Sequence, residues 1–492
     1  MKRDFANNRN EQIKKKETMY DRMKKKRLAT VGCCLLLSVA ALAGNYAKFY
    51  QGLPVAMNEP VAPVIPQNSV MLTDFGGVGD GVTMNTTAFA KAISALNKKG
   101  GGRLVVPAGV FLTGPISLKD NIDLHLERNA MILFSPDKKD FLDIDAKTGE
   151  KKSSKARPGI SASKRKNISI TGEGIIDGNG EWWRGVKRSK VSDTEWSAYK
   201  EMGGMEAENG TLWYPFGLKH FDNIAATYKE QEQMRTHLVR LTDCENVLIE
   251  GVTIQNAPKF HLVPQRCRNV IIDGVNVRCM WNAQNGDGID LMQCRDVLVV
   301  NSTLDVGDDG ICLKGGVGAE GVKHGPCANI LIENNVVFHA HGGFVIGSEF
   351  SGGMNNIVVR HNTFSGTDTG LRFKSGAGRG GKTSGIFISD IMMSDIRNEA
   401  VVFETSYADR PVGSSEKTEK PKAEDFIPEF CDIHIERVVC RDARTAIAAK
   451  GTKEMIHDIE LTDCVFFYTK KDKAVDDDSM LKLNNVRLLT FK

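Results

Sequence analysis

The sequence contains Gly286-Asp287-Gly288-Ile289-Asp290-Leu291, Asp308-Asp309-Gly310-Ile311-Cys312-Leu313, His341-Gly342-Gly343-Phe344-Val345-Ile346 and Asp368-Thr369-Gly370-Leu371-Arg372-Phe373-Lys374. The four segments align without gaps on Gly288, Gly310, Gly343 and Gly370. Carboxylates, an imidazole and two cations therefore recur at equivalent places in successive repeats. If the repeats stack, these side chains converge on one patch that has the composition of an active site.

A short motif, the start signal, marks the start of each repeat. Each aligned glycine follows this motif by 16 residues, except Gly288, which follows it by 21. The signal occurs as Cys244-Glu245-Asn246-Val247, Cys267-Arg268-Asn269-Val270, Cys294-Arg295-Asp296-Val297, Cys327-Ala328-Asn329-Ile330 and Met354-Asn355-Asn356-Ile357, and more weakly as Ser384-Gly385-Ile386 and Cys431-Asp432-Ile433. Successive signals are 23, 27, 33, 27, 30 and 47 residues apart. A fixed start with variable length indicates a repeat protein with loop insertions on one face.

The residues after each signal have the pattern of short strands. The run Val247-Leu248-Ile249-Glu250-Gly251-Val252-Thr253-Ile254 alternates apolar and polar side chains and is rich in β-branched residues. Unequal repeats of such strands predict an all-β fold, a parallel β-helix in which each repeat is one coil and equivalent residues stack about 4.8 Å apart. A β-propeller is the alternative, but its repeats are longer and more uniform.

The N-terminal segment is predicted to be separate from this solenoid. Residues 1–43 have the pattern of a secretory signal, because basic residues from Met23 precede an uncharged run of 16 residues that ends in Ala41-Leu42-Ala43. The run is short for a membrane span, although an uncleaved anchor is the alternative. The polar lead is long, so translation from Met23 is a further hypothesis. Residues 44–68 are predicted to be a linker, and residues 69–492 a single β-helix domain.

The solenoid is predicted to carry a capping helix and two insertions. A helical pattern near its start has five apolar residues on one face, after Asn85 or Thr86 as N-cap: Ala88, Phe89, Ala92, Ile93 and Leu96. Such a helix would cover the open edge of the first coil. Residues 182–236 hold nine aromatic residues, which could line a saccharide site or form a small satellite core. Residues 407–428 are expected to be a solvated loop.

The charge balance does not indicate a nucleic-acid partner. Residues 1–28 carry 11 Lys and Arg and 4 Asp and Glu, a net +7, whereas the whole chain is +4. The remainder is therefore 4 − 7 = −3, without the basic excess of a nucleic-acid-binding protein.

Nine of the 11 cysteines follow the predicted signal. Five are predicted to start a repeat, where a small apolar side chain stacks in the interior: Cys244, Cys267, Cys294, Cys327 and Cys431. Cys431 and Cys440 are predicted at opposite ends of one strand, too far apart to bridge. There is no Cys-x-x-Cys pair. The sequence therefore predicts buried thiols rather than disulfides or a metal site.

The carboxylates of the aligned segments point to acid–base chemistry. Asp287 aligns with Asp309, and Asp308 is the neighbour of Asp309. Three carboxylates so close cannot all ionise easily, so we expect one pKa to rise. A protonated carboxyl beside ionised ones suits glycoside hydrolysis, in which one group protonates the leaving oxygen and another activates water or attacks the sugar. His341, one coil further, can tune the acid by hydrogen bonding.

Two cations complete the patch. Arg372 and Lys374 lie two residues apart on a predicted strand and so face the same side. They suit a substrate with its own carboxylate, such as a uronic acid. Taken singly, each feature has another interpretation: Asp-Asp-Gly is a common turn, Arg-x-Lys is a common solvated strand face, and the carboxylates Asp287, Asp290, Asp308 and Asp309 could bind Ca²⁺. Their coincidence at equivalent positions favours the active site.

These motifs resemble those of the family 28 glycoside hydrolases, the polygalacturonases and their pectin-degrading relatives. Asn285-Gly286-Asp287 is similar to the family's Asn-Thr-Asp motif, Asp308-Asp309 to its Asp-Asp pair, His341-Gly342 to its His-Gly, and Arg372-Phe373-Lys374 to its Arg-Ile-Lys. Asp74-Phe75-Gly76-Gly77-Val78-Gly79-Asp80-Gly81 also looks like the family's opening segment. Two departures are Gly286 in place of Thr and Phe373 in place of Ile.

The resemblance implies a right-handed, pectin lyase-like parallel β-helix and hydrolysis of galacturonic acid linkages with inversion. It gives Asp308 the role of general acid, Asp287 and Asp309 the activation of water, and His341 the support of the acid. Arg372 and Lys374 would bind the substrate carboxylate, and Asn285 would help to hold the substrate. Gly343-Phe344-Val345-Ile346-Gly347-Ser348-Glu349 is more similar to exo-acting members than to endo-acting ones.

The resemblance leaves the substrate within pectin open, because a xylogalacturonan or a rhamnogalacturonan also contains galacturonate. The residues also allow a Ca²⁺-dependent pectate lyase, or a β-helix that binds glycans without catalysis. We expect a pectic polysaccharide or oligogalacturonide as partner, no cofactor or metal ion, no nucleic acid, and no membrane insertion after removal of the signal. We also expect a monomer that is exported to the periplasm or secreted.

Overall fold

A computed structural model describes residues 46–143, 155–207, 209–215, 232, 234–407 and 425–491. The predicted signal and most of the second predicted insertion lie outside the described residues. The chain divides into two compact units, Met1–Gly52 and Leu53–Lys492. Of the first unit the structure describes residues 46–52, which include one 3₁₀ turn, Ala47–Tyr50. The second unit holds all the sheets described below.

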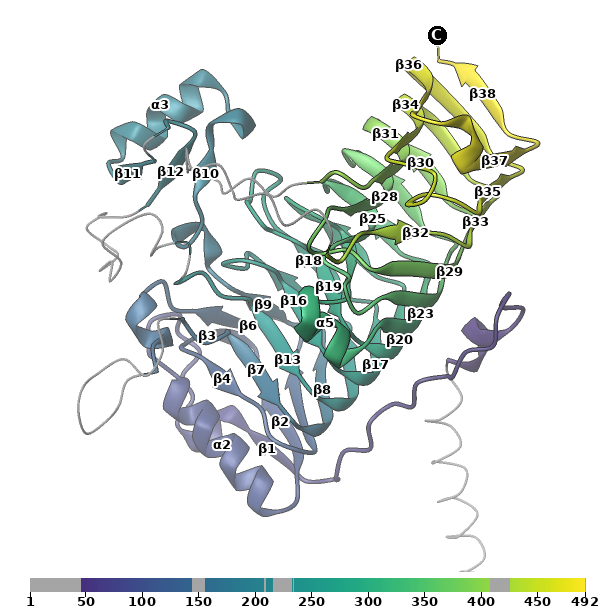
Figure 1. Cartoon of the computed structure of the whole chain (residues 1–492). Coiled ribbons are helices and arrows are strands. Elements are labelled where there is room, and N and C mark those ends of the chain that lie inside the picture. The colour runs from purple at the N-terminus through teal and green to yellow at the C-terminus, as the bar shows by residue number, and fades with distance from the viewer. Residues whose placement is uncertain are drawn as a thin grey trace, which may run out of the picture. The chain divides into compact units, whose positions relative to one another are not determined.

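The second unit is a right-handed parallel β-helix, as the sequence predicted, with three strand ladders (Figure 1). The first ladder contains β1 (Ser69–Met71), β2 (Gly102–Val106), β5 (Ile122–Leu126), β8 (Lys166–Gly172), β14 (Glu245–Glu250), β17 (Arg268–Asp273), β20 (Arg295–Val300), β23 (Cys327–Glu333), β26 (Met354–Arg360), β29 (Lys382–Ser389), β32 (Glu429–Phe430), β33 (Ile433–Glu436), β35 (Ile459–Thr462) and β37 (Leu481–Asn484). The second contains β3 (Gly109–Thr113), β6 (Ala130–Phe134), β9 (Ile175–Asp177), β15 (Thr253–Gln255), β18 (Asn276–Arg278), β21 (Thr303–Asp305), β24 (Val336–Val337), β27 (Thr363–Ser365), β30 (Met392–Ser394) and β38 (Arg487–Thr490).

The third ladder carries the aligned segments of the sequence. It contains β4 (Ile116–Ser117), β7 (Ile160–Ser163), β13 (Val239–Thr242), β16 (Leu262–Gln265), β19 (Ile289–Met292), β22 (Ile311–Lys314), β25 (Gly342–Ser348), β28 (Thr369–Ser375) and β31 (Ile396–Glu404). Two long strands, β34 (Val439–Lys450) and β36 (Val465–Val475), pair with strands of both the second and the third ladder.

Asparagines at the bends make the coils regular. Asn246, Asn269 and Asn329 have φ of 56°, 60° and 56°, a left-handed conformation that asparagine tolerates better than most residues. Their amides also bond between coils, with Asn269 Nδ2 donating to Asn246 Oδ1 at 2.5 Å. The segment predicted as a linker touches these bends, because Val61 N donates to Asn269 Oδ1 at 2.6 Å and Val61 O accepts from Asn269 Nδ2 at 3.1 Å.

Three α-helices are described, and the first covers the start of the solenoid. They are α2 (Thr86–Lys98), α3 (Asp193–Glu201) and α5 (Gly318–His324). The five buried residues of α2 are the five that the sequence predicted, and the helix packs on β1 and β2. Asn85 is its N-cap residue, but the Asn85 side chain does not cap the helix. It bonds instead to Val78 N at 2.7 Å, across the preceding loop.

The interior of the coils is a continuous apolar stack, and cysteines form part of it. Cys244, Cys267, Cys294 and Cys327 are each at most 2% exposed. The nine cysteines of the described residues are all free. Cys431 is also a buried thiol, as predicted, at 3% exposed. Its predicted position was wrong, because Thr383 pairs with Phe430 in the register and Phe430 fills the stacking position. Cys431 and Cys440 also lie on either side of β33, not at the ends of one strand.

The first insertion forms a small lobe. It contains α3 and an antiparallel sheet of β10 (Val186–Lys187), β11 (Met205–Glu206) and β12 (Leu212–Tyr214). Its aromatic residues divide between buried clusters and the wall of a cavity. Trp183 is buried in the main core and Tyr214 in a satellite cluster, while Trp182, Tyr199 and Trp213 line a cavity of about 400 Å³. Among the described residues, no helix is long and apolar enough to cross a membrane.

Candidate active site

The register of the third ladder confirms the alignment made on the sequence. Ile289 pairs with Ile311, Ile311 with Phe344, and Phe344 with Leu371, so the four preceding glycines are equivalent. The glycines are required by the close approach of neighbouring coils. A Cβ on Gly288 would lie 2.7 Å from the carbonyl oxygen of Gly310, and a Cβ on Gly370 would lie 2.6 Å from that of Ala400.

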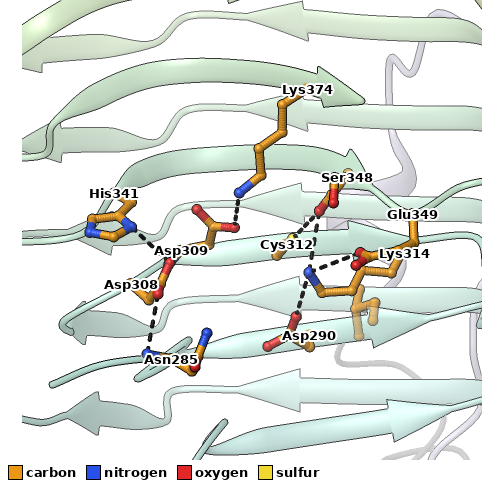
Figure 2. A network of polar contacts seen from close by, with 12 residues as sticks. Asn285, Asp290, Asp308, Asp309, Cys312, Lys314, His341, Ser348, Glu349 and Lys374 are labelled. Atoms are coloured by element: carbon orange, nitrogen blue, oxygen red, sulfur yellow. Dashed lines mark hydrogen bonds and ion pairs between the residues drawn. The ribbon is translucent and has the colours of Figure 1, made fainter. Parts of the chain in front are cut away.

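Asp308 is held by three contacts on two sides. His341 Nδ1 lies 2.8 Å from Asp308 Oδ1, and the backbone N–H of Asp309 donates to the same oxygen at 3.1 Å. The other oxygen, Oδ2, accepts the backbone N–H of Asn285 at 3.2 Å. Figure 2 shows Asp308 between His341 and Asn285, so the carboxyl is fixed in orientation by its neighbours on both adjacent coils.

Asp309 faces the two predicted cations. Lys374 Nζ donates to Asp309 Oδ2 at 2.7 Å, and Arg372 Nη1 donates to Oδ1 at 3.4 Å. Burial would raise the pKa of Asp309, but Lys374 and Arg372 outweigh it and lower that pKa below its usual value. Asp309 is therefore an ionised carboxylate, as a group that activates water must be.

Asp287 is the most strongly perturbed carboxyl of the patch. It is 3% exposed, and its Oδ1 has no hydrogen-bond partner among the described residues. Burial first, and then the charges of Asp290 and Asp308, hold the pKa of Asp287 well above its usual range. One pKa thus rises as predicted, but burial contributes more to the rise than the crowding of carboxylates does. Burial also raises the pKa of Asp290 to about 7, so the site holds a fourth perturbed carboxyl.

Asp308, to which the resemblance gives the role of general acid, is ionised in this structure. Burial would raise its pKa, but the charge and hydrogen bond of His341, with Lys374 and Lys190, hold it well below its usual value. The carboxyl with the raised pKa is therefore Asp287 and not Asp308. The sequence could not reveal this, because the distribution of protons depends on which cations the fold brings to each carboxyl.

A second polar group adjoins these carboxyls. Lys314 Nζ lies 3.5 Å from Asp290 Oδ1 and 3.7 Å from Glu349 Oε2, and it donates to the carbonyl of Gly347 at 3.2 Å. Figure 2 shows this group beside the pair of Asp309 and Lys374. Lys314 and Asp290 were visible in the alignment, whereas Glu349 lies just after its strand and had no motif to mark it.

Two residues that the sequence analysis missed position the catalytic segment. His261 Nδ1 lies 2.8 Å from the carbonyl of Asp287, and its Nε2 accepts the N–H of Ala257 at 3.2 Å. Burial lowers the pKa of His261 to about 4, so the ring is neutral and donates from Nδ1. Arg235 Nη2 donates to Asn285 Oδ1 at 2.7 Å. His261 is equivalent to Gly288 one coil earlier on the third ladder, and Arg235 lies in the first insertion. Neither residue belongs to the four aligned segments, so the alignment did not mark them.

The two departures from the family motifs have local causes. A Cβ on Gly286 would lie 2.9 Å from Cys279 Sγ and 3.1 Å from Ala283 Cβ, so a threonine would require the preceding loop to move. Phe373 is fully buried and stacks on Phe403, with ring centroids 4.4 Å apart and planes at 13°. Both differences therefore concern packing behind the site and not the reacting groups.

Three side chains near Asp309 could bind a metal ion, but the carboxylate of Asp309 is already paired with cationic side chains of the protein. Asp308, Asp309 and His341 each offer one ligand atom, and these atoms lie within 4.8 Å of one another. Both oxygens of Asp309, however, accept from Lys374 and Arg372. A divalent ion would have to displace these cations, so the donor set fits Ca²⁺ poorly.

Comparison with known proteins identifies the family. The model described as Glycosyl hydrolases family 28 matches residues 204–471, which is more than half of the chain. The chain belongs to this family. The exo-poly-alpha-D-galacturonosidase of Dickeya chrysanthemi is 32% identical over 349 residues, which cover 69% of this chain and 57% of that protein. A probable polygalacturonase of Vitis vinifera is 28% identical over 342 residues, which cover 67% and 62%.

A solved structure is also similar to this chain. The hyperthermoactive exopolygalacturonase from Thermotoga maritima is 30% identical with a TM-score of 0.66, over 90% of this chain and 96% of that chain. The family 28 chain described here spans less than two thirds of the length of the two curated relatives above, at 57% and 62%.

Proposed function

We propose that the protein hydrolyses α-1,4 linkages between galacturonic acid residues of pectin, with inversion of the anomeric carbon. The observation that carries the proposal is the stack of Asp287, Asp309 and Asp308 on adjacent coils with Arg372 and Lys374 bound to Asp309. In an inverting hydrolase one carboxyl protonates the leaving oxygen while another removes a proton from water. A cationic pair next to them would bind the carboxylate of a uronic acid substrate.

Asp308 acts as the general acid once substrate is bound. The cations that lower its pKa include Lys374, and a uronate bound to Lys374 and Arg372 neutralises their charge. Loss of that charge removes one of the causes that lower the pKa of Asp308, so this pKa rises and Asp308 can carry the proton that the leaving oxygen needs. Asp287 and Asp309 are left as the carboxylates that activate water. His341, at 2.8 Å, supports and orients Asp308, and Asn285 helps to hold the sugar.

The same proposal includes attack from the end of the galacturonan chain. The lobe of the first insertion approaches the site, since Val186 bridges to Ala283 and Lys190 Nζ donates to the carbonyl of Gly307 at 2.8 Å. Gly307 immediately precedes the two catalytic carboxyls. A lobe fixed there would close one end of the groove to a continuing chain. The exo-acting names of the relatives from Dickeya chrysanthemi and Thermotoga maritima support this.

Mass spectrometry of the products from polygalacturonate tests the proposal. Saturated galacturonate monomer is expected, and Asp308→Asn should reduce its formation by about 100-fold or more, since general acid catalysis contributes roughly 10² to 10⁴. Mixed saturated oligomers would reject exo action and retain hydrolysis. Unsaturated products, with loss of activity in a chelator, would reject hydrolysis in favour of the Ca²⁺-dependent lyase. Products from branched pectins alone would move the substrate to xylogalacturonan or rhamnogalacturonan.

We also propose that the protein acts outside the cytoplasm as a monomer. The charged lead and the apolar run up to Ala43 support export to the periplasm or beyond, and a pectic substrate requires it. Nucleic acid and the membrane are not partners of the mature protein in this proposal. N-terminal sequencing of protein from the periplasm and the culture fluid, with its mass by light scattering, tests these points.

A further inference from the structure

Three side chains with metal-binding atoms gather outside the groove. Glu429, Cys431 and His457 each offer one ligand atom, and these atoms lie within 4.8 Å of one another. Glu429 belongs to β32, Cys431 follows that strand, and His457 lies just before β35. Both strands belong to the first ladder, whereas Asp308 and Asp309 precede β22 of the third ladder. This cluster is therefore separate from the reacting carboxyls.

The backbone brings the three side chains to one face. Phe430 forms a parallel bridge with Ile456, and His457 N donates to the carbonyl of Phe430 at 3.1 Å. Phe430 and Ile456 are fully buried in the core. Since successive side chains of an extended chain point to opposite faces, Glu429, Cys431 and His457 share the face turned away from the core.

The distances between the ligand atoms suit a tetrahedral zinc ion. Glu429 Oε1 lies 3.3 Å from Cys431 Sγ and 3.5 Å from His457 Nε2. Zinc bonds of about 2.3 Å to sulfur and about 2.0–2.2 Å to nitrogen and oxygen place neighbouring ligand atoms of a tetrahedron about 3.3–3.6 Å apart. The two measured distances therefore match two edges of such a tetrahedron.

The imidazole is also oriented as a ligand. His457 Nδ1 lies 2.7 Å from Asp458 Oδ2, while His457 Nε2 faces Glu429. Histidines that bind metal ions usually donate their other ring N–H to a carboxylate, which fixes the tautomer and the direction of the ring. Asp458 thus leaves the lone pair of Nε2 free to bind a metal ion.

A competing cation at this cluster is easily displaced. Lys382 Nζ lies 3.1 Å from Glu429 Oε1, but the Lys382 side chain is 61% exposed. The Lys374 side chain, which pairs with Asp309, is only 7% exposed. An exposed ammonium can leave its partner for water at little cost, because surface ion pairs contribute little. Glu429 can therefore accept a metal ion where Asp309 cannot.

We propose that Glu429, Cys431 and His457 bind one Zn²⁺ ion, with water as the fourth ligand. The ion takes the place of the thiol proton of Cys431, which passes to the solvent, and bonds to Sγ, Oε1 and Nε2. Thiolate and imidazole ligands select zinc over Ca²⁺ and Mg²⁺. The side chains of Glu429 and His457 are 34% and 36% exposed, so water can reach the fourth position.

The bound ion joins two successive coils near the C-terminal end of the solenoid. It ties β32, the strand that follows the second predicted insertion, to the segment before β35. Phe430, between two of the ligands, packs against Phe373 with ring centroids 6.0 Å apart, so the ion stabilises the core behind the groove. The sequence did not indicate this site, because its ligands come from two coils and include no Cys-x-x-Cys pair.

Calorimetric titration of the metal-free full chain with Zn²⁺ tests the site. The wild type should bind one ion that Cys431→Ser and His457→Gln do not bind. Asp458→Ala should weaken binding by about 10-fold to 100-fold, the usual loss when the partner of a metal-binding histidine is removed. Lys382→Met removes the competing cation and should strengthen binding by about two-fold to five-fold. His361→Gln removes an imidazole outside the cluster and should change nothing.

Two further measurements distinguish a built site from an adventitious ion only. Co²⁺ in place of zinc should give the wild type a thiolate-to-cobalt charge-transfer absorption, which Cys431→Ser should lack. Thermal unfolding in chelator establishes that each variant is folded, and added zinc should raise the unfolding midpoint of the wild type but not that of Cys431→Ser. Equal zinc binding by the wild type and both ligand variants would mean an adventitious ion only and would overturn the proposal. A wild type that binds no zinc, or binds Co²⁺ without the thiolate absorption, would overturn it as well.

Discussion

Asp290 should make the protein less stable as the pH rises from 4 to 7. The side chain is fully buried, and burial raises its pKa from 3.8 to about 7. Between those values the folded protein keeps a proton that the unfolded chain has lost, so the free energy of unfolding falls as pH increases. Below about pH 4 both states are neutral at this position, and above about pH 7 the loss is complete.

The size of the effect follows from the same two values. At 1.36 kcal/mol for each pH unit, the gap from 3.8 to about 7 corresponds to on the order of 4 kcal/mol. Asp290→Asn removes this titration. The variant should come closest to the wild type at the acidic end of this range and exceed its stability at pH 8 by up to this amount, because the pKa of about 7 already includes the attraction of Lys314. Lys314 keeps Glu349 at 3.7 Å.

Urea unfolding of both proteins between pH 4.5 and 8 measures the difference. The midpoint of the variant should rise relative to the wild type as the pH increases, with an unchanged denaturant slope. Glu127→Gln neutralises an exposed carboxyl and is the matched control, for which no such divergence is expected. Parallel pH profiles for wild type and Asp290→Asn would refute the reasoning, since they would mean that Asp290 is ionised in the folded protein.

Three further predictions concern the reaction. Lys374→Met removes the main charge that lowers the pKa of Asp309, so that pKa should rise. The acidic limb of the pH profile of kcat/KM should then move to higher pH. An acidic limb that does not move would argue against Asp309 as the ionised base. His261→Leu leaves the N–H of Ala257 unsatisfied, at about 1–3 kcal/mol, and removes one of the two hydrogen bonds to the carbonyl of Asp287. The unfolding midpoint should therefore fall, and kcat should drop about 10-fold with little change in KM. The conservative His261→Asn should recover part of kcat, which a purely structural loss would not predict. EDTA should leave the wild-type rate unchanged, because the cations around Asp309 belong to the protein, and a rate restored only by added Ca²⁺ would contradict this.

The register of the site could be predicted because a parallel β-helix turns sequence alignment into spatial stacking. A Cβ on Gly288 or Gly370 would collide with the next coil, so glycine recurs wherever coils approach, and the recurrence is visible in the sequence. Once these glycines are aligned, Asp287, Asp309 and Lys374 follow at fixed offsets. The predicted alignment fails at Cys431. The start signal is offset there by one residue from the observed register, and Phe430 takes the stacking position.

The sequence by itself therefore determined the fold class, the coil register and the side chains that gather at the candidate site, since each depends on short-range periodicity and close backbone approach. Only the tertiary structure decided which carboxyl has a raised pKa. Burial and the neighbouring carboxyls raise the pKa of Asp287, while His341 and Lys374 lower that of Asp308. Desolvation and charge act through space between distant residues, so their balance is fixed only when the coils are stacked.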